Sequence, residues 1–493
     1  MTDCATLPAP GKRPHTGSTE GDKSSNRSSS VRNRAALTDG PVGRTLARMT
    51  AGMLVGHVSM VAFNLTDTYF VSRLGTGPLA AMSFTLPVVF FFGAVVFGLA
   101  TGASSVISRA IGQGDHHRVQ RLTTHVLILA VATAAAVSLA GMLLARPLFH
   151  MMGARGDVLE MTLSYMRIWF CGAAFMVVPM VGNHAIRATG DAAVPGIIMS
   201  AAALMNLALD PLLIFGCGPV PALGIAGAAW ATILSRLVAM VASLSVLHFR
   251  KRMIALERPR WTQMRHSWGQ LLYVGLPAAG TNILMPITMV LITRMVAGHG
   301  TAAVAAAGAG NRVDMFALMI VNSLGSVLMP FVGQNWGAGR FQRIREAHRR
   351  GQTFALAWGV ACMLVIFAAA RPIAHLFSRD AAVVDNMVLY LHILPIGYGL
   401  MGVMILVGFG MNGINQPVRW AAMNAVRMLG LILPMALLGG WLFGLGGIFA
   451  GIAAGNIAAG LLGWAWLRRL HAMMPALARA DAAAEPAPVP AET

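Results

Sequence analysis

The sequence predicts an all-α polytopic membrane protein: twelve transmembrane helices in two six-helix lobes related by a pseudo-twofold axis along the membrane normal. Three observations carry this prediction: the composition, the recurrence of long apolar segments, and an internal repeat. Of the 493 residues 56% are hydrophobic and only 11% are charged, whereas soluble domains carry about 25% charged residues. Apolar segments of the length that spans a bilayer, about 20 residues each, recur along almost the whole chain.

Twelve such segments can be counted in order. They cover residues 49–72, 84–107, 122–145, 161–186, 196–216, 223–248, 269–296, 304–331, 353–370, 387–410, 420–440 and 445–467. The last two are separated by little more than "GGWLFG", which predicts a tight turn between them.

The polar stretches between and beyond these segments define the remaining regions. Residues 1–44 are rich in Ser, Thr, Gly, Arg and Lys, and predict a disordered cytoplasmic tail rather than a signal peptide. Residues 45–249 form the predicted N-lobe, 250–268 a basic cytoplasmic linker, and 269–472 the C-lobe. Residues 473–493, which end in "AAAEPAPVPAET", predict a second, low-complexity cytoplasmic tail.

The basic residues predict the orientation in the membrane. They gather in the loops after the second, sixth and eighth segments, whereas the loops after the fifth and eleventh segments contain no Lys or Arg. Because cytoplasmic loops carry the excess of Lys and Arg, both termini are expected in the cytoplasm. The net charge of +19 is therefore interpreted as a topology signal, and no nucleic-acid partner is expected.

The internal repeat relates the two halves of the chain. "SRAIGQGDHHR" aligns with "GQNWGAGRFQR" at an offset of 225 residues, which pairs Gly112 with Gly337. "LGIAGAAWA" aligns with "LGGIFAGIA" and pairs Gly224 with Gly446. A repeat of six helices leaves both halves in the same orientation, a plan typical of transporters that bind substrate between the halves.

The repeat is broken at acidic positions of the first half. Of the 18 acidic residues, only Asp67, Asp210 and Asp314 lie inside predicted spans. Asp67 falls opposite Ile292 in the second half, and Asp210 falls opposite Ile432. A charge at mid-bilayer costs about 2.5–3.5 kcal/mol even on the lenient scale, so the asymmetry predicts a function beyond packing.

The spacing of these residues predicts a shared pocket. Asn206 and Asp210 are four apart, and Asn64 and Asp67 are three apart, so each pair shares one helical face. If the first and fifth helices adjoin, up to two carboxylates and two amides converge on a site that holds a proton or a small cation such as Na⁺. The alternative is that these residues only hydrogen-bond neighbouring helices.

Seven motifs taken together resemble the multidrug and toxic compound extrusion (MATE) family over about residues 45–470. They are "NLTDTYFVSRLG", "LAAMSF", "ASSVISRAIGQGD", "AIRATGD", "NLALDPLLIFG", "GIAGAAWAT" and "GQNWGAG". The resemblance implies an antiporter, not an enzyme, that exports organic cations and amphipathic drugs by alternating access in exchange for H⁺ or Na⁺. It also implies a cation site in the N-lobe, at Asp67, Asn206, Asp210 and Thr232, and a bacterial cytoplasmic (inner) membrane location.

The sequence departs from one branch of that family, which has a functional acid in the seventh helix after "GLP". Here the corresponding position, near Met285, is apolar. The chain therefore resembles the DNA-damage-inducible (DinF-like) type, and a second-lobe acid is not expected to act.

Further candidates fall in the C-lobe, where Arg312, Asp314, Met285 and Met289 are candidate lining residues of a substrate cavity. Methionines form pliable surfaces that suit varied apolar ligands, and Arg312 and Asp314 are two apart, so they do not face each other on a helix. No cofactor is expected beyond the coupling ion, no metal beyond Na⁺ at the N-lobe site, and the chain is expected to act as a monomer. The alternative function is a lipid-linked saccharide flippase of the same superfamily.

Overall fold

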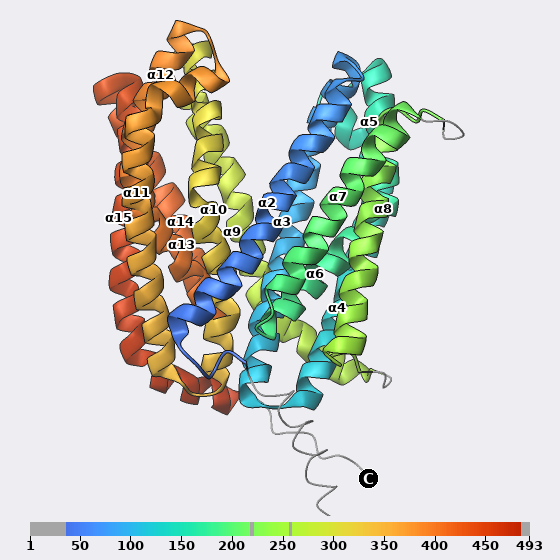
Figure 1. The fold of residues 1–493 in the computed structure, drawn as a ribbon, viewed down its shortest axis with the longest axis vertical. Helices are drawn as coiled ribbons and strands as arrows, with labels where there is room; N and C mark the ends of the chain where they lie inside the picture. Colours follow the sequence, from blue (N-terminus) through green and yellow to red (C-terminus); the bar gives the residue numbers. More distant parts are fainter. Residues whose placement is uncertain (1–35, 217–220, 256–258, 485–493) are drawn as a thin grey trace, which may run out of the picture. The chain divides into compact units, whose positions relative to one another are not determined.

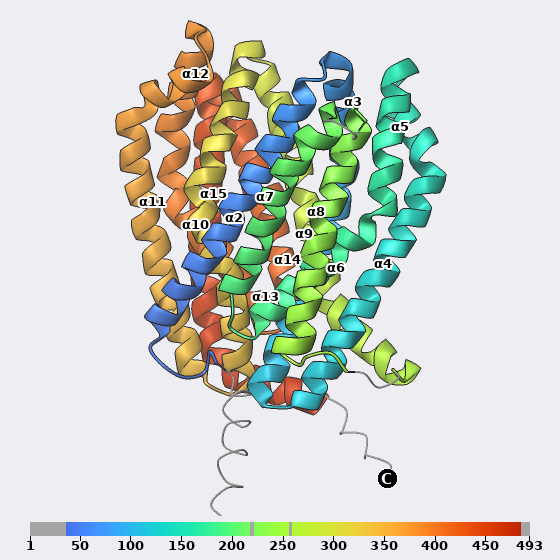
Figure 2. The same ribbon diagram turned by 45° about the vertical axis from the view of Figure 1, so that its right-hand side comes forward.

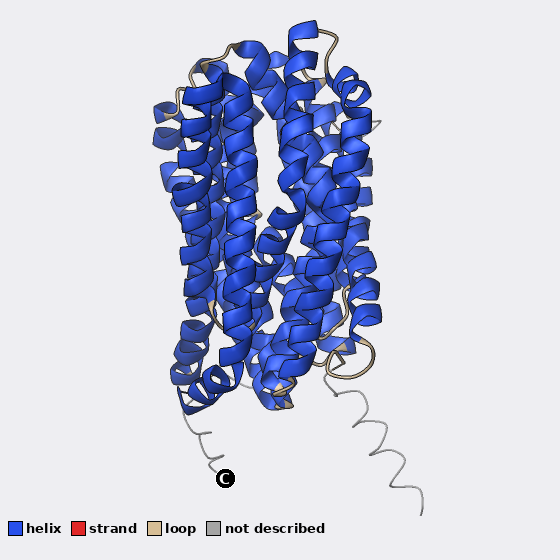
Figure 3. Ribbon diagram, turned by 90° about the vertical axis from the view of Figure 1, so that its left-hand side faces the viewer, coloured by secondary structure: helices blue, strands red, loops and turns tan. Residues whose placement is uncertain are grey.

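The protein is described here by a computed structural model that covers residues 36–216, 221–255 and 259–484. Within these ranges every regular element is helical, as Figure 3 shows by colour. Most of the helices begin earlier or end later than the apolar spans, because polar turns continue the apolar cores beyond the bilayer. The first helix, α2 (Val42–Ser72), thus begins seven residues before its predicted span.

The helices of the first half form the N-lobe. After α2 they are α3 (Thr76–Gln113), α4 (His116–Met151), α5 (Gly156–Cys171), α6 (Ala173–Ala188), α7 (Ala193–Phe215), α8 (Ile225–Ser245) and the π-helix η1 (Val246–Arg250).

The helices of the second half form the C-lobe. They are α9 (Trp261–Ala297), α10 (Thr301–Gly337), α11 (Phe341–Phe377), α12 (Ala381–Ile393), the 3-10 helix η2 (Leu394–Gly397), α13 (Tyr398–Gly413), α14 (Pro417–Ala425), the π-helix η3 (Val426–Ile432) and α15 (Leu433–Ala484).

These elements give the twelve expected crossings. Ten described helical segments are long and apolar enough to span a membrane, and α5 with α6, bent by 49° between them, makes one more. The twelfth comes from α15, which contains a break at Gly444 (φ 61, ψ −141). Gly224 has nearly the same backbone angles (φ 56, ψ −133) where α8 begins, so the structural counterpart of Gly224 is Gly444 rather than Gly446.

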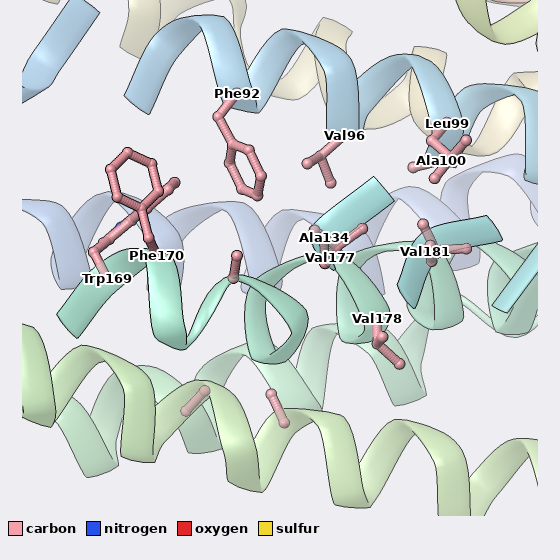
Figure 4. Close-up of a cluster of buried hydrophobic side chains, with 14 of the residues drawn as sticks. Phe92, Val96, Leu99, Ala100, Ala134, Trp169, Phe170, Val177, Val178 and Val181 are labelled. Carbon is pink, nitrogen blue, oxygen red and sulfur yellow. The ribbon is translucent and has the colours of Figure 1, made fainter. Parts of the chain in front are cut away.

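The two lobes are separate groups of helices with their own apolar cores. Figures 1 and 2 show α3 to α8 on one side, α11 to α15 on the other, and α2 crossing obliquely between them. In the N-lobe core, Phe92 of α3 meets Trp169 of α5 edge to face, with ring centroids 4.8 Å apart. Figure 4 shows valines of α6 facing this cluster. Such interlocking gives each lobe the packing of a rigid body.

The lobes meet where the repeat places equivalent residues of α3 and α10. A Cβ added to Gly112 would overlap the carbonyl oxygen of Gln334, and a Cβ added to Gly337 would overlap that of Arg109. Gln334 is the repeat partner of Arg109, as Gly337 is of Gly112. The pseudo-twofold axis therefore relates the two contacts to each other. Small residues permit such close approach of membrane helices. We name this crossing of residues 108–112 with 333–337 the lobe seam.

The further hydrogen bonds between the lobes include one from α3 and one from α2. The Ser105 hydroxyl of α3 donates to the Asn412 carbonyl of α13 at 2.5 Å. His57 Nδ1 of α2 lies 2.7 Å from Ser323 Oγ of α10.

The residues just before α2 are packed against the C-lobe. Leu37 is buried, and its backbone N–H donates to Gln334 Oε1 at 3.0 Å. Its carbonyl accepts from Asn335 Nδ2 at 3.1 Å, and Arg343 Nη1 donates to the Gly40 carbonyl at 2.8 Å. The tail predicted for residues 1–44 is therefore wrong over 37–44, which are ordered and end in α2. Residues 1–35 of that prediction lie outside the described residues.

The lower part of α2 packs between the two lobes. Val42, Leu46, Met49 and Met53 are buried in one apolar cluster with residues of α10, α11 and α13. On the other side of these turns, Gly52 lies against Ala193 of α7.

The predicted linker and C-terminal tail are also shorter than expected. The linker predicted for 250–268 already becomes helical at Trp261, and its first residues are held to the N-lobe by Gln120, which donates to the Arg252 carbonyl at 2.9 Å. Lys251 Nζ donates to Asp191 Oδ2 at 3.0 Å. Burial by itself raises the pKa of Asp191, but the hydrogen bond and the positive charge of Lys251 outweigh it, and the pKa is lowered. Helix α15 continues to Ala484, past the predicted boundary at 472.

The lobe seam yields a prediction for Gly112→Ala. The added methyl group would meet the Gln334 carbonyl, so the substitution should lower the free energy of unfolding by about 1–3 kcal/mol, the usual cost of overpacking. Gly280→Ala is the matched control, because Gly280 also lies within a helix but has open space around it. The control should be neutral or stabilising by up to about 1 kcal/mol. Reversible unfolding in mixed micelles measures both, and equal effects would contradict the close packing at the seam.

Candidate functional site

The N-lobe contains two buried carboxylates from helices far apart in sequence. Asp67 lies near the end of α2 and is 6% exposed, and Asp210 lies in α7 and is fully buried. The helical spacing places Asn206 one turn before Asp210, and Asn206 Nδ2 donates to Asp210 Oδ1 at 3.0 Å. The Asp67 and Asp210 carboxylates are close enough to repel each other electrostatically. The structure therefore brings together the first and fifth spans as the sequence required.

Tyr165 lies near this pair of acids, and Thr232 lies in α8, the helix that packs against α7. Thr232 of α8 is buried, and its hydroxyl has no partner among the described residues. Tyr165 of α5 is buried and interacts electrostatically with both carboxylates. The sequence analysis did not select Tyr165. Its signal was present, because it is one of only five tyrosines in the chain and lies within a predicted span.

The cluster presents unfilled acceptors. Four buried oxygen atoms have no hydrogen-bond partner within the described residues: Asp67 Oδ1, Asn206 Oδ1, Asp210 Oδ2 and Thr232 Oγ1. Buried polar atoms of native proteins are normally paired, and hard cations prefer all-oxygen ligand sets. A proton on a carboxylate, or a small cation between the oxygens, would satisfy them. No Lys or Arg of the described chain forms an ion pair with either acid.

Asn64 is not part of this cluster. Its side chain is exposed, and its Nδ2 donates to the Met60 carbonyl one turn earlier in the same helix, at 3.0 Å. The sequence placed Asn64 and Asp67 on one face because they are three residues apart. The helix instead turns Asp67 into the lobe and leaves Asn64 at its surface, so Asn64 is corrected to a position outside the site.

The C-lobe holds a carboxylate of its own. The Tyr390 hydroxyl donates to Asp314 Oδ2 at 2.7 Å, and the Tyr398 hydroxyl donates to Asp314 Oδ1. Asp314 lies in α10, and the tyrosines come from α12 and α13. The expectation that no second-lobe acid acts concerned the seventh helix, and Asp314 of the eighth was a separate candidate for the substrate cavity. Both Asp314 oxygens are paired, whereas Asp67 Oδ1 and Asp210 Oδ2 have no partner within the described residues.

The remaining C-lobe candidates do not join Asp314. Arg312 is exposed and makes no described ion pair with it, as their two-residue spacing predicted. Met285 and Met289 are 60% and 47% exposed on α9. They therefore lie at a surface of the helix bundle.

A second polar cluster of the N-lobe escaped the sequence analysis in part. Arg187 of α6 is 2% exposed, its Nη1 contacts the Met53 sulfur at 3.0 Å, and its Nε has no partner in the described chain. His57 and His184 lie near enough to interact with this guanidinium. Arg187 was visible in the sequence only as part of "AIRATGD".

The comparison with known families decides the assignment. The MatE family profile matches residues 53–212 and 277–438, one match in each lobe. The chain belongs to the MATE family. Members of this family are transporters rather than enzymes, and the protein is accordingly a multi-pass membrane transporter of small molecules.

Curated relatives of this MATE transporter carry two kinds of name. A protein of Shewanella oneidensis named "FAD transporter" is 37% identical over 87% of this chain and 95% of its own length. The "Multidrug export protein MepA" of Staphylococcus saprophyticus is 26% identical over 83% of this chain and 89% of its own length.

Solved structures of MATE transporters share the fold. The Vibrio cholerae transporter VcmN in the bent form gives a TM-score of 0.84 at 30% identity, over 88% of this chain and 98% of that one. A multidrug resistance MATE transporter in an outward-facing conformation gives 0.83 at 26% identity, over 89% and 98%. The predicted fold class, twelve helices in two lobes, is confirmed.

The paired state of Asp314 yields a prediction. Tyr390→Phe and Tyr398→Phe each remove one hydroxyl donor to its carboxylate. Each should lower the free energy of unfolding by roughly 1–3 kcal/mol, since a partly buried acceptor then loses its partner. Tyr69→Phe is the control, because the Tyr69 hydroxyl is exposed and accepts from Arg73 at 2.7 Å; it should change stability by no more than about 0.5 kcal/mol. Unfolding curves in which all three variants coincide would contradict the assignment.

Proposed function

We propose that this MATE transporter is a secondary active exporter driven by a cation that binds at Asp67, Asn206, Asp210 and Thr232. The observation that carries the proposal is the pair of buried carboxylates without a basic partner in the described chain, beside oxygen acceptors that nothing fills. Buried, unpaired acids in a membrane protein mark ion pathways far more often than packing.

A single proton or a single Na⁺ can serve this site. With both carboxylates ionised, their mutual repulsion in apolar surroundings is unfavourable, and either a shared proton or an intervening cation relieves it. We favour H⁺, because two close carboxylates in apolar surroundings favour holding a proton between them. Release of the cation on the other side of the membrane would restore the repulsion and bias the lobes toward the alternate state.

Two substrate classes are candidates for export. The resemblance noted in the sequence implies organic cations and amphipathic drugs, which is also the activity that the name of the 26% identical relative records. The 37% identical relative is named for FAD, and this higher identity makes a flavin dinucleotide the first substrate to test. We propose that export proceeds by alternating access of one monomer, with the lobe seam as the closed side.

The coupling model predicts the behaviour of two substitutions. Asp67→Asn and Asp210→Asn should each abolish cation-driven flux while the protein remains folded, because Asn keeps the shape of Asp but cannot exchange charge. The double variant should be no worse than either single one, since residues that act as a unit are non-additive. Ile292→Asn, at the equivalent C-lobe position, should retain coupling and is the matched control. Flux in reconstituted vesicles measures all four; half-maximal, additive losses would overturn the single-site model.

The same vesicles distinguish ion and substrate. A pH gradient and a Na⁺ gradient are imposed separately, with FAD, a fluorescent organic cation or a labelled lipid-linked saccharide as cargo. We expect the pH gradient to drive FAD export, and movement of the saccharide alone would establish the flippase alternative.

Orientation is tested with cysteines at matched exposed loop positions. In a background without native cysteines, Arg155→Cys lies between α4 and α5, and Arg260→Cys lies directly before α9. If the termini are cytoplasmic, an impermeant thiol reagent added to whole cells should label the first and not the second. The reverse pattern would invert the location of both the seam and the proposed release side.

A further inference from the structure

A buried arginine that the proposed transport cycle does not use lies at the end of α6. Arg187 is only 2% exposed, yet a guanidinium group remains positively charged in proteins. Its Nη1 contacts the Met53 sulfur of α2 at 3.0 Å, and its Nε has no hydrogen-bond partner within the described residues. A thioether is a weak acceptor and carries no charge, so this contact does not neutralise the guanidinium.

No carboxylate of the described residues supplies the missing negative charge, since none of their ion pairs includes Arg187. Asp191 is the acid nearest to Arg187 in the sequence, but its Oδ2 accepts from Lys251 at 3.0 Å. The titratable side chains that do interact with Arg187 are His57 and His184. A histidine is either neutral or positive, so neither can serve as the counter-charge.

The end of the helix accounts for only part of this burial. Arg187 lies in the last turn of α6, where the carbonyl end of the helix dipole favours a positive charge. That contribution is small beside the cost of taking an ion out of water, and the thioether contact adds little to it. A negative charge held next to the guanidinium would make up the difference.

The same face of α6 carries a second unpaired polar group. Asn183 lies four residues before Arg187, which places both side chains on one side of the helix. Asn183 is buried, and its Oδ1 has no hydrogen-bond partner within the described residues. A half-turn of the amide exchanges its oxygen and nitrogen, so that it donates instead of accepting. Arg187 and Asn183 can then donate together to one anion.

This face of α6 lies close to the junction of the two lobes. Met53, which contacts Arg187, is buried in the apolar cluster with residues of α10, α11 and α13. The carbonyl of Ala188, the residue after Arg187, accepts from Gln334 Nε2 of α10 at 2.7 Å. An anion held by Arg187 therefore lies next to the contacts that close the lobe seam.

We propose that Arg187 is the centre of a binding site for a small inorganic anion such as chloride, held between α6 and α2. The anion accepts from the guanidinium, restores neutrality in the buried cluster and stabilises the packing of α2 against α6 beside the seam. The site stands whether or not the carboxylate cluster drives export, because it shares no residue with Asp67, Asn206, Asp210 or Thr232.

Thermal unfolding of the purified full-length chain tests the site, with sodium gluconate replaced stepwise by sodium chloride at constant ionic strength. Chloride should raise the unfolding temperature saturably, because it binds the folded state, whereas gluconate is too large for a buried site. Arg187→Gln removes the charge and should weaken the affinity for chloride about tenfold or more. Arg187→Lys keeps the charge without the planar fork and should retain a weaker response.

Arg349→Gln is the matched control. It removes the same charge from an exposed position of α11, and should change the affinity for chloride less than about twofold. An equal loss of the response in this variant would reduce the chloride effect to screening of the general positive charge and overturn the proposal.

Bromide locates the site without any substitution. It replaces chloride and scatters anomalously, so crystals of the unaltered chain grown in bromide should show an anomalous peak beside the Arg187 guanidinium. This measurement and Arg187→Lys decide the matter if Arg187→Gln does not fold. The proposal is wrong if chloride leaves the unfolding temperature of the unaltered chain unchanged, if the response survives Arg187→Gln, or if bromide binds only elsewhere.

Discussion

The arrangement of the two lobes depends on a backbone contact that only glycine permits. At the lobe seam Gly112 faces the carbonyl of Gln334, and its repeat partner Gly337 faces that of Arg109. The Gln334 side chain also accepts from Leu37 and donates to the Ala188 carbonyl of α6 at 2.7 Å. One residue of the C-lobe thus joins α3, α6 and the segment before α2. The junction thereby fixes where the chain enters α2 relative to both lobes.

The fold was largely predictable because each membrane helix corresponds to an apolar segment of about the length that spans a bilayer. The twelve spans, the two lobes and the repeat followed from apolar runs and glycine motifs, and the structure agrees. Residues 37–44 were not predictable, since their order comes from Asn335 and Arg343 about 300 positions away. By composition this segment is only rich in polar and small residues, and composition does not reveal contacts with residues so far away in the sequence.

The candidate site was predictable to the extent that burial of charge is rare. Asp67, Asn206, Asp210 and Thr232 are all buried in the N-lobe, and a charge inside an apolar run is a strong signal. Asn64 shows the limit of this reasoning. Residues three apart share a helix face only approximately, so Asp67 can be buried while Asn64 is exposed. Tyr165 was missed because a tyrosine in an apolar segment has no distinctive pattern until its neighbours are known.

Helix α2 is continuous and packs against α7 of the N-lobe from Gly52, beside Ala193, to Asp67, near Asp210. Its first turns are also buried among α10, α11 and α13 of the C-lobe. It contains no proline, so no built-in kink isolates one end from the other. If the lobes separate at the seam, α2 must therefore tilt, bend or lose its contacts with the C-lobe. Because the helix is continuous, such a movement also displaces Asp67. A change in the packing of the first turns of α2 is therefore mechanically linked to the surroundings of Asp67.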